Sequence, residues 1–250
     1  MKISFRSDIQ ILRAVAVLAV ILYHANIHIL NNKLLPGGFL GVDIFFVISG
    51  YLISKIILNE IETSGKLSIS NFIKNRLRRI VPALFFILLI TILFANLYLF
   101  PLSLLTFGKS LIASIFFLSN FYYLFIGYEY GVNDLIFRPL LHTWSLGIEL
   151  QFYLFFSLLF FFFYKNKTFF NKLIIFIFLS SIFFSIYGNF NFPEKNFYLI
   201  NARIWEFIAG YYICFFEKLS YVKKKNKKTN VFFITGVLLI FFSLFFFNSE

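Results

Sequence analysis

The chain has 250 residues, of which 60% are hydrophobic and 14% are charged, with a mean hydropathy of +0.84. Soluble domains use roughly a quarter charged residues, so this composition excludes a water-soluble globular domain and requires lipid as solvent. The net charge of +12 would suggest nucleic-acid binding in a soluble protein. Here the basic residues lie between apolar runs, so we expect no nucleic-acid partner. The single cysteine, Cys214, excludes a disulfide framework and a cysteine-based metal site, and we expect no bound metal.

Seven apolar runs have close to the ~20 residues that cross the hydrocarbon of a bilayer. They cover about residues 9–30, 39–58, 80–100, 144–164, 173–190, 204–220 and 231–247. The first run is too long for a signal-peptide core, which predicts an uncleaved membrane helix. Pro82 is expected in the first turn of the third helix, where its missing N–H costs nothing.

Clusters of basic residues predict which loops are cytoplasmic. These clusters are Lys2 with Arg6, Lys74 to Arg79, Lys165 to Lys172, and Lys218 to Lys228. One further apolar run, 107–126, would invert the charge of every later loop if it crossed the membrane, so it is predicted to be re-entrant or interfacial. The sequence therefore predicts an all-α polytopic membrane protein with about seven transmembrane helices plus this segment. We expect a single membrane domain over residues 1–250, with its N-terminus in the cytoplasm.

Ionisable residues inside membrane helices are costly and mark candidate functional sites. Arg13 and His24 lie in the first predicted helix, eleven positions apart. This spacing corresponds to three turns plus about 20°, so both share one face. Their separation along the axis is roughly 16 Å at ~1.5 Å per residue. Arg13 is therefore expected near the cytoplasmic surface and His24 in the outer half of the membrane.

Asp43 begins the second predicted helix, which runs back inward after a short turn containing Pro36, Gly37 and Gly38. An antiparallel hairpin would place Asp43 at the depth of His24. A carboxylate beside an imidazole can fix its tautomer and raise its basicity.

Three more ionisable residues enter the same outer layer at the outer ends of other inward-running helices: Glu149, Arg203 and Glu206. One such residue alone could equally be polar glue between helices. Because several separate helices bring ionisable groups to a matched depth, a functional site is the better interpretation.

On the cytoplasmic side, Arg76, Arg78 and Arg79 precede the third apolar run. The plain interpretation is an orientation signal. Arginine is also a good phosphate ligand, and Arg13 at the same membrane face adds weight to a phosphate site.

Five segments together resemble the acyltransferase-3 family of bacterial integral-membrane O-acyltransferases. The segments, in family order, are LRAVAVLAVILYH (12–24), GGFLGVDIFFVISGYLIS (37–54), RLRRIVPAL (76–84), LHTWSLGIELQFYLF (141–155) and FYLINARIWEFIAG (197–210). One departure is Leu150, which stands where a second acidic residue is common. Domains of that family usually carry about ten spans, which suggests a C-terminally truncated or fragmentary domain here.

The resemblance implies transfer of an acyl group, most often acetyl, from cytoplasmic acyl-coenzyme A to a carbohydrate or glycolipid hydroxyl. O-antigen, exopolysaccharide and peptidoglycan are typical acceptors, and the protein would lie in the bacterial inner membrane. Acyl-coenzyme A is then a donor substrate, and no tightly bound cofactor is expected.

The resemblance also implies roles for the candidate residues. His24, Asp43 and Glu149 would be catalytic, with His24 as general base or as the carrier of a transient acyl group. Arg13, Arg76 and Arg79 would bind the donor. Arg203, Glu206 and Trp144 would shape the acceptor side.

Two alternatives stay open. A non-enzymatic transporter of glycans or protons would also place charges at mid-depth. Such a transporter predicts inverted repeats, and the sequence shows no internal repeat. The second alternative is an acyltransferase made inactive by truncation.

Overall fold

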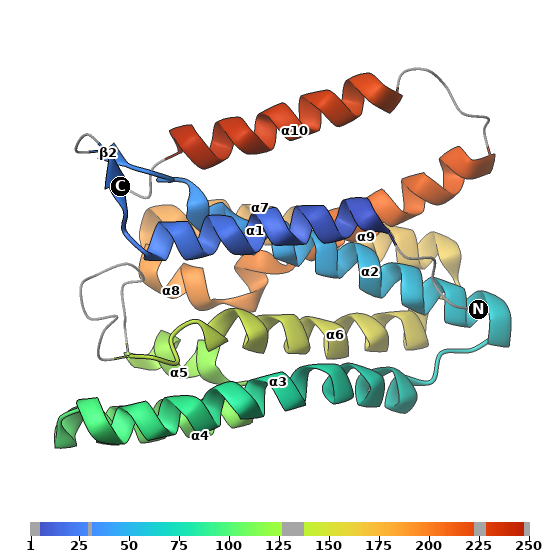
Figure 1. Cartoon of the computed structure of the whole chain (residues 1–250). Helices are drawn as coiled ribbons and strands as arrows, with labels where there is room; N and C mark the ends of the chain where they lie inside the picture. Colours follow the sequence, from blue (N-terminus) through green and yellow to red (C-terminus); the bar gives the residue numbers. More distant parts are fainter. Residues whose placement is uncertain (1–5, 30–31, 127–137, 223–228, 248–250) are drawn as a thin grey trace. The chain divides into compact units, whose positions relative to one another are not determined.

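The computed structural model describes residues 6–29, 32–126, 138–222 and 229–247, and helices make up most of these (Figure 1). The long helices are α1 (Ser7–His24), α2 (Gly41–Ser64), α3 (Ile69–Tyr98), α6 (Thr143–Phe163), α7 (Lys167–Asn191) and α9 (Ile200–Val222). The shorter elements are β1 (His28–Ile29), β2 (Asn32–Lys33), η1 (Gly38–Leu40), α4 (Pro101–Ile115), α5 (Ser119–Ile126), α8 (Pro193–Tyr198) and α10 (Thr229–Phe246). The expected all-α membrane fold is confirmed.

Five helices of the described chain are long and apolar enough to cross a membrane: α1, α2 with η1, α3, α6 and α7. The two other predicted spans, 204–220 and 231–247, also form helices, α9 and α10. Charged side chains lower the hydropathy of α9, and the apolar stretch described in α10, Ile234–Phe246, is shorter than a full span. The chain is therefore a multi-pass membrane protein.

The chain divides into two compact units, Met1–Ile56 with Glu206–Glu250, and Ile57–Trp205. We call them the first and the second unit and describe each by itself. The first contains α1, the two-residue β-ladder, η1, most of α2 and α9, and α10. The second contains α3 to α8 together with the ends of α2 and α9 that adjoin them.

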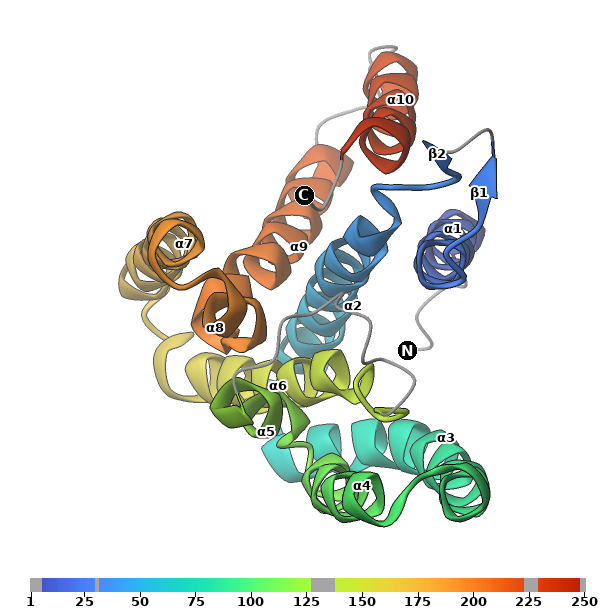
Figure 2. The same cartoon turned by 90° about the vertical axis from the view of Figure 1, so that its left-hand side faces the viewer.

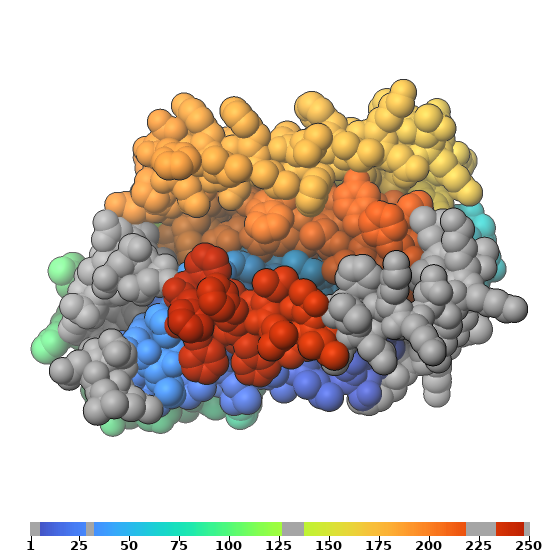
Figure 3. Space-filling view, turned by 90° about the horizontal axis from the view of Figure 1, so that it is seen from above, coloured from blue at the N-terminus to red at the C-terminus, as the bar shows by residue number. Residues whose placement is uncertain are grey.

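Helices of the first unit approach one another at glycines. A Cβ atom on Gly38 would lie 2.4 Å from the Ala19 carbonyl oxygen, and one on Gly41 would lie 2.5 Å from that of Ala16. These contacts form the predicted hairpin of α1 and α2. Figure 3 shows α10 beside the blue surface of this N-terminal hairpin. It packs there through Ile240 and Leu244 against the cluster around Ala19.

In the second unit, α3 packs against α4 and α6, while α5 packs against α6 and α8 (Figure 2). One buried cluster combines Leu88, Ala95, Phe107 and Leu140. A second group of buried aromatic side chains lies along α6, including Phe152, Phe156 and Phe160. Rings of this size contribute most of the contact area between such helices.

Two helix boundaries differ from the sequence prediction. The first apolar run was expected to be helical to about residue 30, but α1 ends at His24 because Asn26 turns the chain with a φ of 52°. Asn adopts this left-handed conformation more easily than most residues. The prediction that Pro82 begins a helix is also wrong, since α3 begins at Ile69 and Pro82 lies inside it. The polar stretch before Pro82 is helical because Phe72 anchors it at 3% exposure.

The run 107–126 is not one continuous helix. It is divided between α4 and α5 at Phe117, which has a φ of 57°. The N–H of Leu118 donates to the Ala113 carbonyl at 2.8 Å and that of Phe117 to the Ser114 carbonyl at 3.1 Å, which is a Schellman end. At ~1.5 Å per residue neither piece can cross ~30 Å of hydrocarbon, in agreement with a re-entrant or interfacial segment.

Candidate active site

His24 occupies the last position of α1, where its side chain is exposed. Its Nδ1 lies 2.8 Å from the carbonyl oxygen of Val20. A carbonyl oxygen can only accept a hydrogen bond, so Nδ1 carries the proton and the lone pair of the neutral ring is on Nε2. The sequence predicted that Asp43 would fix this tautomer. In the structure, the hydrogen bond from Nδ1 goes to the Val20 backbone carbonyl of the same helix.

The His24 ring contacts the ring of Tyr23 edge-on, with the centroids 5.2 Å apart. The ammonium of Lys33 lies 3.5 Å from the centroid of the Tyr23 ring, and burial lowers the pKa of Lys33 below its usual value. The tyrosine next to His24 therefore also binds the cation that β2 supplies after the turn.

Asp43 lies in the first turn of α2 and is half-buried. Gly41 packs against Ala16 and Val20, and the His24 ring reaches back to the Val20 carbonyl. Asp43 lies two residues past Gly41 on α2, farther from the turn of the hairpin than the contact of Gly41 with Ala16 and Val20. The matched depth of His24 and Asp43 and the catalytic role of both residues stay predictions.

Glu206 is also in the first unit and is only 1% exposed. It precedes Phe207, whose ring stacks on Phe46 with centroids 4.6 Å apart. Because Phe46 follows Asp43 by about one turn, both carboxylate residues flank this aromatic stack. Burying a carboxylate is costly, which supports the interpretation of Glu206 as a functional residue.

In the second unit, Arg203 and Trp144 come together as the predicted acceptor side requires. The Arg203 guanidinium carbon lies 5.9 Å from the Trp144 ring centroid and 5.1 Å from that of Phe197. Trp144 is 1% exposed and contacts Phe197 with centroids 4.4 Å apart. We call Arg203, Trp144 and Phe197 the arginine–aromatic cluster. Phe197 lies on the separate short helix α8, so no helical period relates it to Trp144 or Arg203 in the sequence.

Glu149 is half-buried on α6, about one turn before the middle of the helix. It accepts a hydrogen bond from the hydroxyl of Tyr153. The two residues are four positions apart, so this pair was readable from the sequence as helix neighbours. The tyrosine holds the carboxylate in one orientation, and the catalytic role of Glu149 stays a prediction.

The predicted donor-binding arginines lie in different units. Arg13 is half-buried in α1. Arg76 and Arg79 lie on α3, where Arg76 is half-buried beside the Phe72 ring at 5.6 Å and Arg79 is exposed. An exposed arginine at a helix surface can meet a mobile phosphate group without losing a buried contact.

A charged network that the sequence analysis missed lies at the end of α1 opposite His24. Glu217 of α9 accepts from Arg6 at 2.7 Å, from the Tyr51 hydroxyl, and from Lys55 at 3.4 Å. Lys55 also donates to the Tyr51 hydroxyl at 2.8 Å. The pKa of Arg6 is raised, first by its hydrogen bond to Asp8. This network ties the N-terminus of α1 to α2 and α9. Tyr51 and Lys55 are helix neighbours, but nothing in the sequence pairs them with Glu217.

A buried amide pair holds the broken segment against α6. Gln151 donates to the Asn120 side chain at 2.8 Å and to the Phe117 carbonyl at 3.2 Å. Asn120, which is fully buried, donates to the Tyr198 carbonyl at 3.3 Å. The Schellman turn, α6 and α8 are thereby fixed together beside Trp144.

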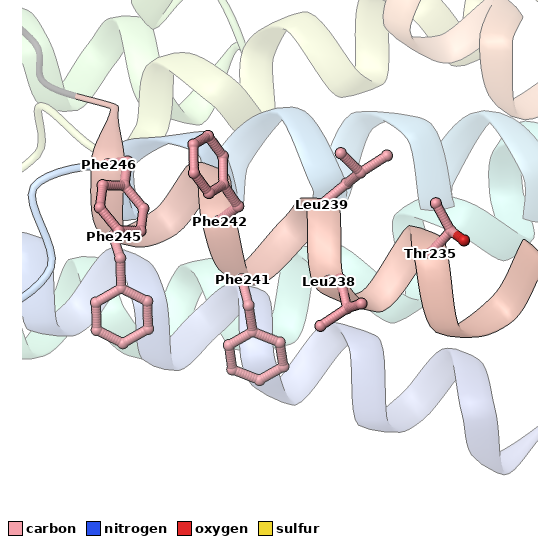
Figure 4. A pocket seen from close by; sticks show the side chains of 7 residues that line it. All are labelled: Thr235, Leu238, Leu239, Phe241, Phe242, Phe245 and Phe246. Atoms are coloured by element: carbon pink, nitrogen blue, oxygen red, sulfur yellow. The ribbon is translucent and has the colours of Figure 1, made fainter.

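A hollow of about 490 Å³ on α10 is not a candidate site. Figure 4 shows its lining, in which Thr235 is the one residue with a polar side chain and all side chains come from this single helix. The exposed phenylalanines there, such as Phe242 and Phe246, are typical of a surface that faces lipid.

Comparison with known proteins agrees with the membrane fold and the motif pattern. The acyltransferase-3 family model, described as an acyltransferase domain, matches residues 6–250. The O-acetyltransferase OatA of Staphylococcus aureus strain NCTC 8325 / PS 47 is 42% identical over 147 residues, which are 59% of this chain and 23% of that protein. A protein of S. aureus strain MSSA476, provisionally named an O-acetyltransferase, is 41% identical over 158 residues, or 63% of this chain and 25% of its own.

The matched region spans about a quarter of the length of these curated relatives. No solved structure matches the chain.

Proposed function

The chain belongs to the acyltransferase-3 family, and from that premise we propose that it is a membrane O-acyltransferase that moves an acetyl group from cytoplasmic acetyl-coenzyme A to a hydroxyl of a cell-envelope carbohydrate. The names of its relatives support acetyl as the group transferred. The observation that carries the proposal is the hydrogen bond from His24 Nδ1 to the Val20 carbonyl, which leaves Nε2 as the basic nitrogen.

In this reaction, Nε2 of His24 takes the proton of the acceptor hydroxyl while the hydroxyl oxygen attacks the thioester carbonyl carbon. A C–O bond forms, the C–S bond breaks, and the coenzyme A thiolate leaves. The imidazolium returns its proton to the thiolate. Asp43, on the facing helix of the same hairpin, would stabilise the transient positive charge on the ring.

The donor would enter from the cytoplasmic side. Its nucleotide is polyanionic, and Arg13, Arg76 and Arg79 offer forked donors to its phosphates. Arg13 and His24 share one face of α1, roughly 16 Å apart along the axis. An extended pantetheine arm can cover that distance and carry the thioester to the imidazole.

The acceptor would lie at the arginine–aromatic cluster. Trp144 is buried, so it would shape the acceptor side by holding Arg203 over its ring. Arg203 adds a donor for acidic or hydroxyl groups of the glycan, and Glu149 and Glu206 are acceptors for its hydroxyls. A bacterial inner-membrane location with a cytoplasmic N-terminus fits the basic loops. Of these basic residues, Lys2 and Lys223 to Lys228 lie outside the described residues.

Replacing His24 with alanine tests the proposal. Acetyl transfer should fall by about a hundredfold to ten-thousandfold, the usual contribution of a general base. The measurement is transfer of radiolabelled acetyl from acetyl-coenzyme A to glycan in membranes with equal amounts of protein.

His28→Ala is the matched control. His28 is also exposed, and its Nδ1 lies 2.9 Å from the backbone carbonyl of Asn26, but it is outside α1. It should retain transfer within about twofold, since substitutions at surface sites without special contacts have small effects. Full transfer by the His24→Ala variant would refute the assignment.

A further inference from the structure

A groove of about 550 Å³ opens on the second unit beside the arginine–aromatic cluster. Its apolar walls are Phe121, Phe155, Ile177, Phe184, Ile200 and Ile204. Its polar residues are Gln151, Ser180, Ser181 and Asn201. The groove is therefore built by α5, α6, α7 and the first turns of α9, and its volume is in the range of ligand sites in proteins.

The groove lies within membrane-spanning helices. Ser180 and Ser181 are near the middle of α7, and Phe155 is near the middle of α6, two helices that can cross the bilayer. The surroundings at that depth are hydrocarbon. The lipid bilayer around the groove therefore offers hydrocarbon chains as ligands for it.

The serine and glutamine side chains of the groove already have partners in the protein. Ser180 donates to the Ile177 carbonyl at 3.0 Å. Ser181 donates to the Asn201 carbonyl at 2.6 Å and accepts from the Trp205 N–H at 3.0 Å. An apolar chain can cover these hydroxyls without leaving a buried donor unsatisfied. A polar ligand is not required to complete the site.

The groove and the arginine–aromatic cluster share two helices. Asn201 lines the groove, and Arg203, two residues later on α9, lies over Trp144. On α6, Gln151 lines the groove two turns after Trp144, a distance of about 10 Å along the axis. The groove and Arg203 therefore share the first turns of α9.

We propose that this groove binds the hydrocarbon chain of a lipid-linked glycan, with the lipid phosphate at Arg203. The acceptor is then a glycolipid carried in the membrane. This inference rests on the proposed function and specifies its acceptor. Arginine suits a phosphate at the end of such a chain because its fork matches the phosphate oxygens.

Filling the groove tests the proposal. Ser180 is exposed on the groove side of α7, and Ser180→Phe adds a ring where the chain would lie. The apparent KM for a polyprenyl-diphosphate-linked oligosaccharide should rise about tenfold, the loss of burial for about two methylene groups. The KM for the same oligosaccharide without its lipid should stay within twofold.

Leu179→Phe is the matched control, because Leu179 is 59% exposed on the same helix but does not line the groove. It should leave both KM values unchanged. Ile177→Phe, a second filling variant, should reproduce the selective effect. Equal effects of the filling variants on both acceptors, or none on either, would overturn the groove assignment.

A binding measurement separates this inference from the proposed function. A polyprenyl diphosphate with a photoreactive group in its tail should label α7 or α9 of purified wild-type protein, and Ser180→Phe should reduce that labelling about tenfold. Competition by excess ordinary phospholipid as effective as competition by unlabelled polyprenyl diphosphate would identify a plain lipid site and overturn the proposal. Labelling without any acetyl transfer to either acceptor would retain the groove and refute the acyltransferase function.

Discussion

The two units of the chain use glycine in different ways. In the first unit, Gly38, Gly41, Gly50 and Gly210 each lie against backbone atoms of another helix, at distances of 2.0–2.5 Å for an added Cβ. In the second unit, Gly188 faces the side chain of Asn196 at 2.2 Å for an added Cβ, and Gly147 approaches the Phe117 carbonyl only to 3.0 Å. A backbone cannot move away without displacing its helix, whereas a side chain can be replaced. The helices that carry His24, Asp43 and Glu206 are therefore held by contacts that allow no adjustment.

This difference indicates which side chains must be positioned precisely: those on the tightly packed helices of the first unit. A general base works when its nitrogen is positioned within hydrogen-bond reach of the reacting hydroxyl, so small shifts of α1 against α2 are costly. The arginine–aromatic cluster holds its partner through side chains, and such contacts can adapt to different glycans. The unit with rigid backbone contacts thus carries the predicted general base, and the unit with adaptable side-chain contacts carries the predicted glycan-binding cluster.

The largest effect is expected at the crossing of α2 and α9. A Cβ on Gly50 would lie 2.0 Å from the Phe207 carbonyl oxygen. Gly50→Ala should lower the free energy of unfolding by about 3 kcal/mol or more, because the helix itself must move. The measurement is the fraction of monomeric protein that survives heating in detergent.

Gly236→Ala is the control, since nothing lies within 4 Å of a Cβ at this position of α10. That variant should be unchanged or slightly more stable, because alanine favours a helix by about 1 kcal/mol over glycine. A Cβ on Gly210 would lie 2.1 Å from the Val47 carbonyl oxygen. Gly210→Ala should therefore lower the free energy of unfolding as Gly50→Ala does. Wild-type stability of both crossing variants would remove the distinction between the two units.

A smaller and reversible effect is expected in the second unit. A Cβ on Gly188 would lie 2.2 Å from the side-chain oxygen of Asn196. Gly188→Ala should therefore destabilise the protein by about 1–3 kcal/mol through overpacking. Asn196→Ala in the same chain removes the obstacle, so the double variant should be more stable than the sum of the two single changes.

The outcome is measured as a double-mutant cycle of thermal midpoints in detergent. Asn196→Ala alone also loses the hydrogen bond to the Ser185 carbonyl at 2.9 Å, and the cycle subtracts that cost. Simple additivity would show that the side chain of Asn196 is not the obstacle to an alanine at position 188, and the comparison between the units would then fail.

The sequence predicted most helices because apolar runs of membrane length are a strong signal. It missed the start of α3, since a basic stretch resembles a loop and only the buried Phe72 reveals otherwise. It also missed the end of α1, which depends on the backbone of Asn26. Loop charge predicted that 107–126 is re-entrant or interfacial. It did not predict the break at Phe117, because phenylalanine rarely adopts a positive φ.

The candidate site was predictable to a similar degree. Arg13 and His24 share a helix, so their common face follows from periodicity alone. The Glu149–Tyr153 pair also follows from helix spacing. The bond to Val20 that fixes the His24 tautomer depends on a rotamer. Contacts between distant segments, such as Glu217 with Arg6, require the fold.

The smallest expected effect concerns the donor arginines, which are divided between the units. Arg79 in the second unit is exposed and Arg13 in the first is half-buried. Arg79→Lys keeps the charge that orients the loop but loses the forked geometry that binds phosphate in two places. The Kd for coenzyme A should rise about two- to fivefold, the loss of about 0.5–1 kcal/mol.

Arg13→Lys should weaken binding more, because a half-buried arginine is less screened by solvent. Calorimetry on purified wild-type and variant proteins measures both, with Arg78→Lys, another exposed residue of the same helix, as the matched control. Equal affinities for all four proteins would leave the arginines of α3 as orientation signals and assign donor binding to other groups.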